Sequence, residues 1–321
     1  MEILLTGGAG FIGSHLAERL LDEDHHVVCV DNFNDYYSPK IKRQNIRALL
    51  SHSRFELVET DIRDYSRLEE CFSVHHFDTI VHLAARAGVR PSIQQPRLYQ
   101  QVNVEGTVNL LELARIHNVK RFIFASSSSV YGNNKKVPFS EKDNVDHPIS
   151  PYAATKKAGE LLVYTYHHLY GIHASCIRFF TVYGPRQRPD MAIHKFTRLI
   201  DRGEPIPVFG DGTTRRDYTY VSDIIDGLVE AMNRCEGYEI YNLGDSKTIS
   251  LMEMIRKIEE ALEKKAILQF FPAQPGDVEI TYADISKAME KLNYHPKVFF
   301  EEGIRNFVAW YRDIGKTLDQ T

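Results

Sequence analysis

The residues EILLT at positions 2–6, followed by GGAGFIG at positions 7–13, decide the fold. The first stretch is short and apolar, as in a buried strand, and the second opens a segment of helical periodicity at 11–21. Gly7, Gly10 and Gly13 fit a tight turn, close approach of the backbone to a ligand, and close packing of helix on strand. A helix N-terminus also offers free N–H groups to phosphates. The stretch therefore predicts a pyrophosphate-binding strand–turn–helix unit.

Similar units follow along the chain. Further strands are expected at His26–Asp31, Phe55–Thr60, Thr79–Ala84, Arg121–Ser126, Ala174–Phe179 and Tyr238–Leu243, and further helices at Asn103–His117, Pro151–Tyr170, Leu251–Glu263 and Glu302–Tyr311. Strands alternating with helices favour an α/β fold with a doubly wound parallel (Rossmann) sheet. From Thr181 glycine and proline become denser, which favours irregular structure over the carboxyl ends of the strands. We expect a nucleotide-binding domain over 1–180, with a returning segment near 222–245, and a smaller C-terminal α/β substrate-binding domain mainly over 181–321.

Composition narrows the class of protein. The chain has 321 residues and a net charge of −4, which favours neither nucleic-acid nor membrane partners. No apolar run approaches the roughly 18 residues that span a bilayer. The four cysteines lack CxxC spacing, so we expect buried reduced thiols and a cytoplasmic protein. The histidine pairs 25–26, 75–76 and 167–168 lack a metal-ligand spacing such as HExxH, so we expect surface pairs and no metal site.

Asp31 stands at the end of the second expected strand. A carboxylate there accepts hydrogen bonds from an adenosine ribose and repels a 2′-phosphate, so the predicted cofactor is NAD rather than NADP. The alternative interpretation is an ordinary surface turn followed by a strand-terminal aspartate.

Tyr152 and Lys156 lie four residues apart on the helix expected at 151–170, so they share one face. A phenol ordinarily has a pKa of about 10. A neighbouring ammonium and a cationic nicotinamide would lower the pKa of Tyr152 and make it a general base. The strand before this helix ends in the serines 126–129, whose hydroxyls could bond a reacting alcohol or could simply form a polar strand exit.

The motifs together resemble the extended short-chain dehydrogenase/reductases, and among these the nucleotide-sugar epimerases. The resemblance rests on GGAGFIG, Asp31, Asp61-Ile62, HLAA at 82–85, Asn103, SSSSVYG at 126–132, YAATK at 152–156 and RRDYTYV at 215–221. It implies Ser127, Tyr152 and Lys156 as catalytic residues, and a homodimer through the helices at 103–117 and 151–170. The implied cofactor contacts are Gly7, Gly10, Phe11, Ile12, Gly13, Asp31, Asn32, Asp61, Ile62, Leu83, Ala84, Ala85, Tyr152 and Lys156. Asn103 would be a structural or proton-relay residue.

Finer features of the resemblance concern the sugar. DNFNDYYSP at 31–39 and RFFTVYGPRQRPDM at 178–191 look like the UDP-glucuronate 4-epimerases. The implied substrate contacts are Arg90, Ser128, Ser129, Thr181, Arg188, Arg216 and Asp277. Among these, Thr181 with Ser128 or Ser129 would donate to a uronate carboxylate, and Arg216 would bind the diphosphate. Gln274 replaces an arginine common in hexose epimerases, so Arg90 or Arg215 could supply the second phosphate contact.

Other activities remain as alternatives. Sugar 4,6-dehydratases have an Asp–Glu pair at the positions of Ser128 and Ser129, and UDP-glucuronate decarboxylases have a glutamate at the second, so the serines disfavour both reactions. The resemblance thus implies 4-epimerisation of UDP-glucuronate through a transient 4-keto sugar. The rival functions are a UDP-glucose or UDP-N-acetylglucosamine 4-epimerase, a non-catalytic NAD-binding sensor, and an NADPH-dependent keto-sugar reductase, which Asp31 disfavours.

Overall fold

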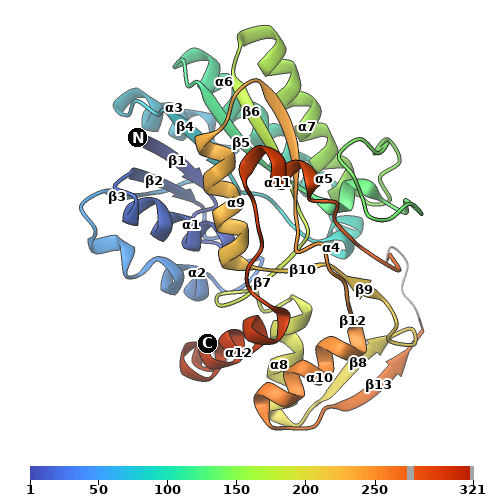
Figure 1. Cartoon of the computed structure of the whole chain (residues 1–321). Helices are drawn as coiled ribbons and strands as arrows, with labels where there is room; N and C mark the ends of the chain where they lie inside the picture. Colours follow the sequence, from blue (N-terminus) through green and yellow to red (C-terminus); the bar gives the residue numbers. More distant parts are fainter. Residues whose placement is uncertain (273–277, 319–321) are drawn as a thin grey trace.

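The computed structural model describes residues 1–272 and 278–318 of the chain. Its centre is a seven-stranded sheet in the order β11-β6-β5-β4-β1-β2-β3, in which every neighbouring pair is parallel (Figure 1). These strands are β1 (Glu2–Thr6), β2 (His26–Asp31), β3 (Phe55–Glu59), β4 (Thr79–His82), β5 (Arg121–Ser127), β6 (His173–Phe179) and β11 (Tyr238–Leu243). The prediction of a doubly wound parallel sheet is confirmed.

Helices cover both faces of the sheet, and others pack below it in the segment after Thr181. They are α1 (Phe11–Asp22), α2 (Pro39–Ile46), α3 (Tyr65–Val74), α4 (Val89–Gln94), α5 (Pro96–Gln100), α6 (Gly106–Ile116), α7 (Pro151–Tyr170), α8 (Ala192–Arg202), α9 (Val221–Asn233), α10 (Leu251–Leu262), α11 (Ser286–Leu292), α12 (Phe300–Trp310) and α13 (Lys316–Leu318). Short 3₁₀ turns occupy Leu49–Ser51 and Ser128–Tyr131, and π-helical turns occupy Gln101–Glu105 and Tyr311–Gly315.

The alternation of side chains along β1 shows how the sheet is buried on both sides. Ile3 and Leu5 pack in one core with residues of α1, α9 and α11, whereas Leu4 packs in a second core with residues of α3, α6 and α7. Successive strand side chains point to opposite faces, so both faces of a doubly covered strand must be apolar. This explains why the strands read as continuous apolar runs.

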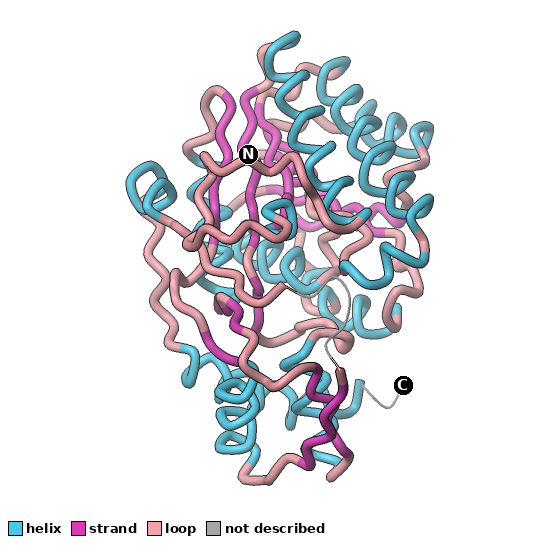
Figure 2. The backbone as a smooth tube through the Cα atoms, turned by 90° about the vertical axis from the view of Figure 1, so that its right-hand side faces the viewer, coloured by secondary structure: helices cyan, strands magenta, loops and turns pink. Residues whose placement is uncertain are grey.

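The segment from Thr181 onward is more regular than its glycine and proline content predicted. It contains three two-stranded pairs: β7 (Thr181–Tyr183) with β10 (Tyr218–Tyr220), β9 (Arg215–Arg216) with β12 (Ile249–Ser250), and β8 (Pro205–Phe209) with β13 (Ile267–Phe271). A third apolar core joins β8 to α8, α10 and α12 at the lower end of the molecule, where Figure 2 shows the β8–β13 pair. The glycines end these short elements, and tertiary packing supplies the strands that the sequence alone did not predict.

The helix expected at Asn103–His117 begins differently. The chain makes a π-helical turn at Gln101–Glu105, and α6 starts only at Gly106. Asn103 lies inside this turn, and its side chain forms hydrogen bonds with residues outside the helix, as described below. These bonds account for the irregular start of α6.

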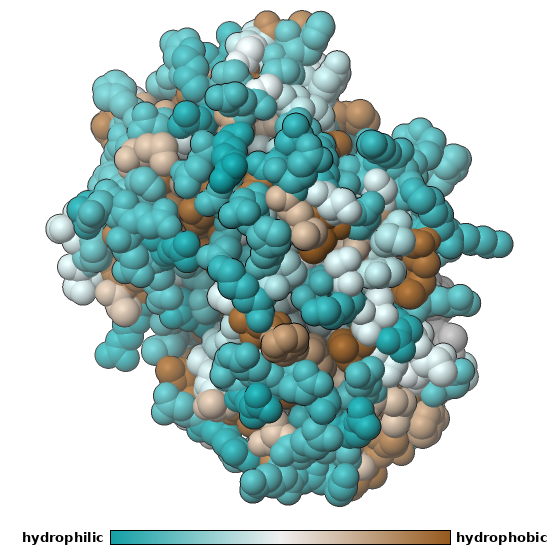
Figure 3. All heavy atoms as spheres, viewed as in Figure 1, coloured by the Kyte–Doolittle hydropathy of each residue, from teal (hydrophilic) through white to brown (hydrophobic). Residues whose placement is uncertain are grey.

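The outer surface is mostly hydrophilic on the face drawn in Figure 3. Within the described residues, no helix combines the length and the apolar character needed to cross a membrane.

Candidate functional site

A cavity of about 560 Å³ lies at the carboxyl ends of the parallel strands. Open α/β sheets bind ligands at this edge. Every cofactor contact implied by the sequence lines it, from Gly7 in the β1–α1 turn to Lys156 on α7. So do Ser127, Ser128, Ser129, Thr181 and Arg188. The fold thus brings residues from separate strand ends into one continuous site.

The β1–α1 turn has the geometry of a phosphate cradle. Gly7 has a φ of +73°, and a Cβ there would lie 2.7 Å from the backbone nitrogen of Ala84. A Cβ on Gly13 would lie 2.2 Å from the carbonyl oxygen of Gly7, so no other residue fits either position without moving the backbone. Helix α1 starts after Gly10 with no side-chain cap and no acidic residue in its first turn. Its first N–H groups can therefore serve an anion such as a dinucleotide pyrophosphate, and the turn fits the predicted cofactor.

Asp31 and Asp61 lie at the adenosine end of the cavity. The Asp31 carboxylate accepts hydrogen bonds from the backbone N–H groups of Ala9 (3.2 Å) and Phe33 (2.9 Å), while burial raises its pKa. Burial also acts to raise the pKa of Asp61, but bonds from Arg63 and from Asn32 Nδ2 (2.7 Å) outweigh it and hold that pKa below its ordinary value. Both carboxylates are held in place by protein donors.

Tyr152 and Ser127 are brought together by the start of α7. Ser150 caps that helix by accepting a bond from Ala153 N–H, and Pro151 occupies the first turn. The two residues line the same cavity, and the Ser127 side chain acts to lower the pKa of Tyr152. Ser127 Oγ accepts the Ser129 N–H at 3.1 Å. The phenol thus shares the cavity with the serine at the end of β5.

The protein groups alone raise the pKa of the Tyr152 phenol. Burial raises the pKa of Tyr152, and the Ser127 side chain only partly offsets it. Lys156 is itself buried, which lowers its pKa to about 7, and its Nζ donates to the carbonyl of Ala125 at 2.6 Å. The chain alone therefore favours the neutral phenol, because desolvation of the phenolate outweighs the nearby donors. The expected lowering of the Tyr152 pKa, which includes the charge of a bound nicotinamide, stays a prediction.

Ser126 points away from this constellation, in a role that the motif at 126–132 does not indicate. Its hydroxyl donates to Glu160 Oε1 at 2.7 Å, beneath the cavity. Arg178 on β6 makes two bonds to the same carboxylate, at 2.8 and 2.9 Å, and both side chains are 1% exposed. Adjacent serines on β5 therefore face opposite sides of the sheet, one toward the reacting groups and one toward a buried ion pair.

Asn103 fixes the loop after β4 against α7. Its Oδ1 accepts the Arg86 N–H at 2.8 Å, and its Nδ2 donates to the Arg86 carbonyl and to Thr155 Oγ1, both at 3.0 Å. The amide is fully engaged with protein groups, which favours the structural role over the proton relay.

Arg188 and Thr181 lie at the sugar end of the cavity. Arg188 binds Asp190 through two nitrogens, each at 2.9 Å, and its guanidinium lies 5.4 Å from the ring centroid of Tyr36. The Arg86 guanidinium lies 5.3 Å from the same ring. The stretch 31–39, which carries part of the family resemblance, supplies Tyr36. The doubled tyrosine within it was the available signal for this aromatic contact.

Two of the implied substrate contacts, Arg90 and Arg216, are not among the residues that line the cavity. Arg90, on α4, places its guanidinium 5.1 Å from the Phe209 ring centroid, outside the cavity lining. Arg216, on β9, also lies outside that lining and donates to the Arg215 carbonyl at 2.9 Å. Asp277, like Gln274, falls outside the described residues. The diphosphate contacts of Arg90 and Arg216 stay predictions.

A nucleotide-binding α/β sheet with a paired tyrosine and lysine at its carboxyl edge defines a short-chain dehydrogenase/reductase of the extended type. The chain belongs to the family described as GDP-mannose 4,6 dehydratase, whose model matches residues 4–307.

Individual relatives are similar over nearly the whole chain. A UDP-glucuronate 4-epimerase of Thermodesulfobacterium geofontis is 45% identical over 97% of this chain and 96% of its own length. The crystal structure of a UDP-glucuronic acid 4-epimerase from Bacillus cereus, solved with UDP-glucuronic acid and NAD, is 38% identical with a TM-score of 0.91, covering 98% of this chain and 100% of that one. A UDP-glucose 4-epimerase from Thermotoga maritima, solved with UDP-glucose, is 34% identical with a TM-score of 0.89, covering 99% and 100%.

Proposed function

We propose that this protein interconverts UDP-glucuronate and UDP-galacturonate by 4-epimerisation with bound NAD. The observation that carries the proposal is that Ser127, Tyr152, Lys156 and Thr181 line one cavity at the carboxyl ends of the strands. The serines at 128 and 129 leave this cavity without the acid–base pair that a dehydratase would need. The similar 4-epimerases of Thermodesulfobacterium geofontis and Bacillus cereus support the same reaction.

Each residue has a defined part in the reaction. Tyr152 takes the proton of the sugar 4-hydroxyl and later returns it, while the Ser127 hydroxyl holds the oxygen in line. Lys156 anchors the end of β5 through Ala125 and lies on the same helix face as Tyr152. NAD, when bound in the β1–α1 cradle, supplies reversible uptake of the hydrogen at C4, so no net oxidation occurs. The sugar must turn over between the two transfers.

A panel of substrates tests the assignment. Purified protein without added NAD should convert UDP-glucuronate into UDP-galacturonate, as followed by NMR of the product. A preference for UDP-glucose or UDP-N-acetylglucosamine would favour the rival epimerase, which the Thermotoga maritima structure supports. No conversion of any UDP sugar would favour the non-catalytic sensor.

Thr181 should control the fate of the intermediate. The 4-keto form of a uronate is a β-keto acid, which loses carbon dioxide when the breaking bond aligns with the ketone π system. Thr181 lines the cavity with Ser128 and Ser129, where its hydroxyl can hold the carboxylate out of that alignment. Thr181→Ala should raise the share of UDP-pentose by at least about tenfold, the value of roughly one hydrogen bond to a charged group.

Thr181→Ser provides the matched control, since it keeps the hydroxyl and should keep the parental product ratio. An alanine variant with the same ratio as the parent would exclude Thr181 from this role.

The remaining proposals concern the roles of the two parts of the chain, the oligomeric state and the cellular location. We infer that the sugar and uridine are held mainly by residues 181–321, and the cofactor by residues 1–180 with the returning strand β11. Exposed apolar side chains on α6 and α7, namely Ile116, Leu161, Tyr164, Leu169 and Tyr170, support a homodimer through these helices. Four buried free cysteines agree with a cytoplasmic location.

A further inference from the structure

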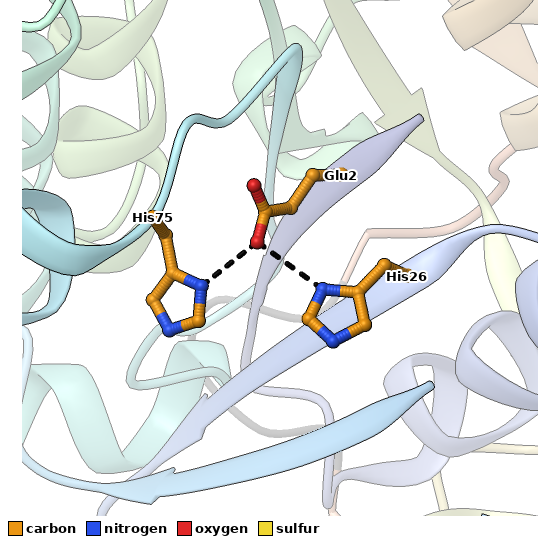
Figure 4. A group of neighbouring side chains, drawn as sticks. All are labelled: Glu2, His26 and His75. Atoms are coloured by element: carbon orange, nitrogen blue, oxygen red, sulfur yellow. Dashed lines mark hydrogen bonds and ion pairs between the residues drawn. The ribbon is translucent and has the colours of Figure 1, made fainter. Parts of the chain in front are cut away.

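Glu2, His26 and His75 converge at the amino ends of the strands, on the edge of the sheet opposite the cavity (Figure 4). Glu2 and His26 open the neighbouring strands β1 and β2 and are partners in the parallel register. His75 directly follows α3. Glu2 Oε1 lies 3.2 Å from His26 Nδ1 and 2.8 Å from His75 Nδ1. Three elements thus direct one oxygen and two imidazole nitrogens to one point.

The spacing of these atoms suits a metal ion. A tetrahedral Zn²⁺ with bonds of about 2.0–2.2 Å holds its ligand atoms roughly 3.4 Å apart. The three candidate ligand atoms all lie within 4.8 Å of one another. Small side-chain rotations would therefore admit the ion. Two histidines and one carboxylate are also a common ligand set for zinc, with the fourth position left to water.

The surroundings hold these ligands in orientation. The second oxygen of Glu2 accepts the backbone N–H of His76 at 3.0 Å. On the far side of the His75 ring, Nε2 lies 3.5 Å from Glu56 Oε1. A carboxylate behind a histidine fixes its tautomer and strengthens it as a ligand, because the nitrogen away from the metal keeps the proton. The His75 ring also stacks on Phe77, with 5.4 Å between centroids.

The ligand side chains differ in their exposure to solvent. The His26 side chain is 35% exposed, whereas the side chain of His75 is 11% exposed. An ion could enter past His26 and bind against a largely buried histidine. Spacing along the chain does not predict such a site, because each ligand is a single residue from a different part of the fold.

We propose that Glu2, His26 and His75 form a binding site for one Zn²⁺ ion, with Glu56 as a positioning residue behind His75. By joining β1, β2 and the end of α3, the ion stabilises the amino edge of the sheet. The site takes no part in the chemistry at the opposite edge. It is therefore independent of the proposed epimerase activity.

Zinc binding to the full-length protein tests the proposal. Protein stripped with a chelator would be titrated with Zn²⁺ against a chromophoric competitor, and in parallel with Co²⁺ to record its visible spectrum. We expect one ion per chain, a tetrahedral Co²⁺ spectrum, and a Tm that rises with Zn²⁺. Glu2→Gln and His75→Gln should each weaken Zn²⁺ binding more than about tenfold, and Glu56→Ala by roughly tenfold.

The exposed His168 on α7 provides the matched control. His168→Gln should bind Zn²⁺ as the parent does, and the variants at 2 and 75 should keep epimerase activity and circular dichroism. A parent protein that takes up no Zn²⁺, or a Glu2→Gln protein that binds it with parental affinity, would overturn the proposal and leave the cluster as a network of hydrogen bonds. A loss of binding in His168→Gln equal to that at His75 would overturn it as well.

Discussion

Replacement of Tyr152 by phenylalanine should lower kcat for UDP-glucuronate by about 10³-fold, within the range of 10²–10⁴ that a positioned general base contributes. The variant loses only the phenol hydroxyl, and the ring keeps its edge-on contact with Tyr99, at 6.2 Å between centroids. Binding of the UDP sugar should therefore change little. Turnover would be measured at saturating substrate, and binding by calorimetry.

Tyr164 on the same helix provides the control for this experiment, since it is 49% exposed and far along α7. Tyr164→Phe should retain parental kcat. Because burial raises the pKa of Tyr152, parental activity should rise with pH until the phenol ionises, and the variant should lose this dependence. A Tyr152→Phe enzyme within a few-fold of the parent would remove Tyr152 as the base.

Replacement of Arg178 by methionine should lower the free energy of unfolding by about 3–5 kcal/mol, because it leaves the buried Glu160 carboxylate without its counter-charge. Arg178 also donates to the Tyr131 hydroxyl at 3.0 Å, so the loss extends to a second strand end. Urea denaturation followed by circular dichroism would measure the change. Arg234→Met is the matched control, since its pair with Glu230 is solvent-exposed and should contribute less than about 1 kcal/mol.

The pH dependence of this effect has a defined sign. Burial acts to raise the pKa of Glu160, but the bonds and charge of Arg178 outweigh it, so the folded pKa lies below the ordinary 4.5. The stabilisation is therefore present above about pH 4.5 and is lost as the pH falls through the folded pKa. The gap between parent and variant should be wide at about pH 7 and should narrow only as the pH falls below about 4.5 and through the folded pKa. A variant as stable as Arg234→Met at neutral pH would contradict the expectation.

A double replacement separates the ion pair from simple loss of packing. Arg178→Met with Glu160→Leu removes both charges, so it should recover a large part of the stability lost in the single variant. Ser126 would then lose its hydrogen-bond acceptor, so the end of β5, which carries Ser127, should become less rigid. We expect kcat to remain lowered even where stability returns.

Some features of the site are set by residues that are neighbours in the sequence, and others are set by the folded structure. The cradle at 7–13 and the pair Tyr152–Lys156 follow from spacing along the chain, because a turn and a helix face are set by neighbouring residues. The direction of the Tyr152 pKa shift does not follow from spacing along the chain, because it depends on how much water the surrounding elements exclude. The contacts of Arg188 also depend on the folded structure, because its partners Asp190 and Tyr36 lie in different loops.

By itself, the sequence determined the parallel sheet, the dinucleotide cradle at 7–13 and the helix face that bears Tyr152 and Lys156. Each depends on periodicity or on the steric needs of glycine, which act over a few residues. Only the tertiary structure decided which strand-end serine faces Tyr152, that Glu160 and Arg178 form a buried pair, and that Glu2, His26 and His75 meet. Those contacts join residues up to 73 positions apart, and their energies depend on burial and on mutual distance, which chain spacing does not encode.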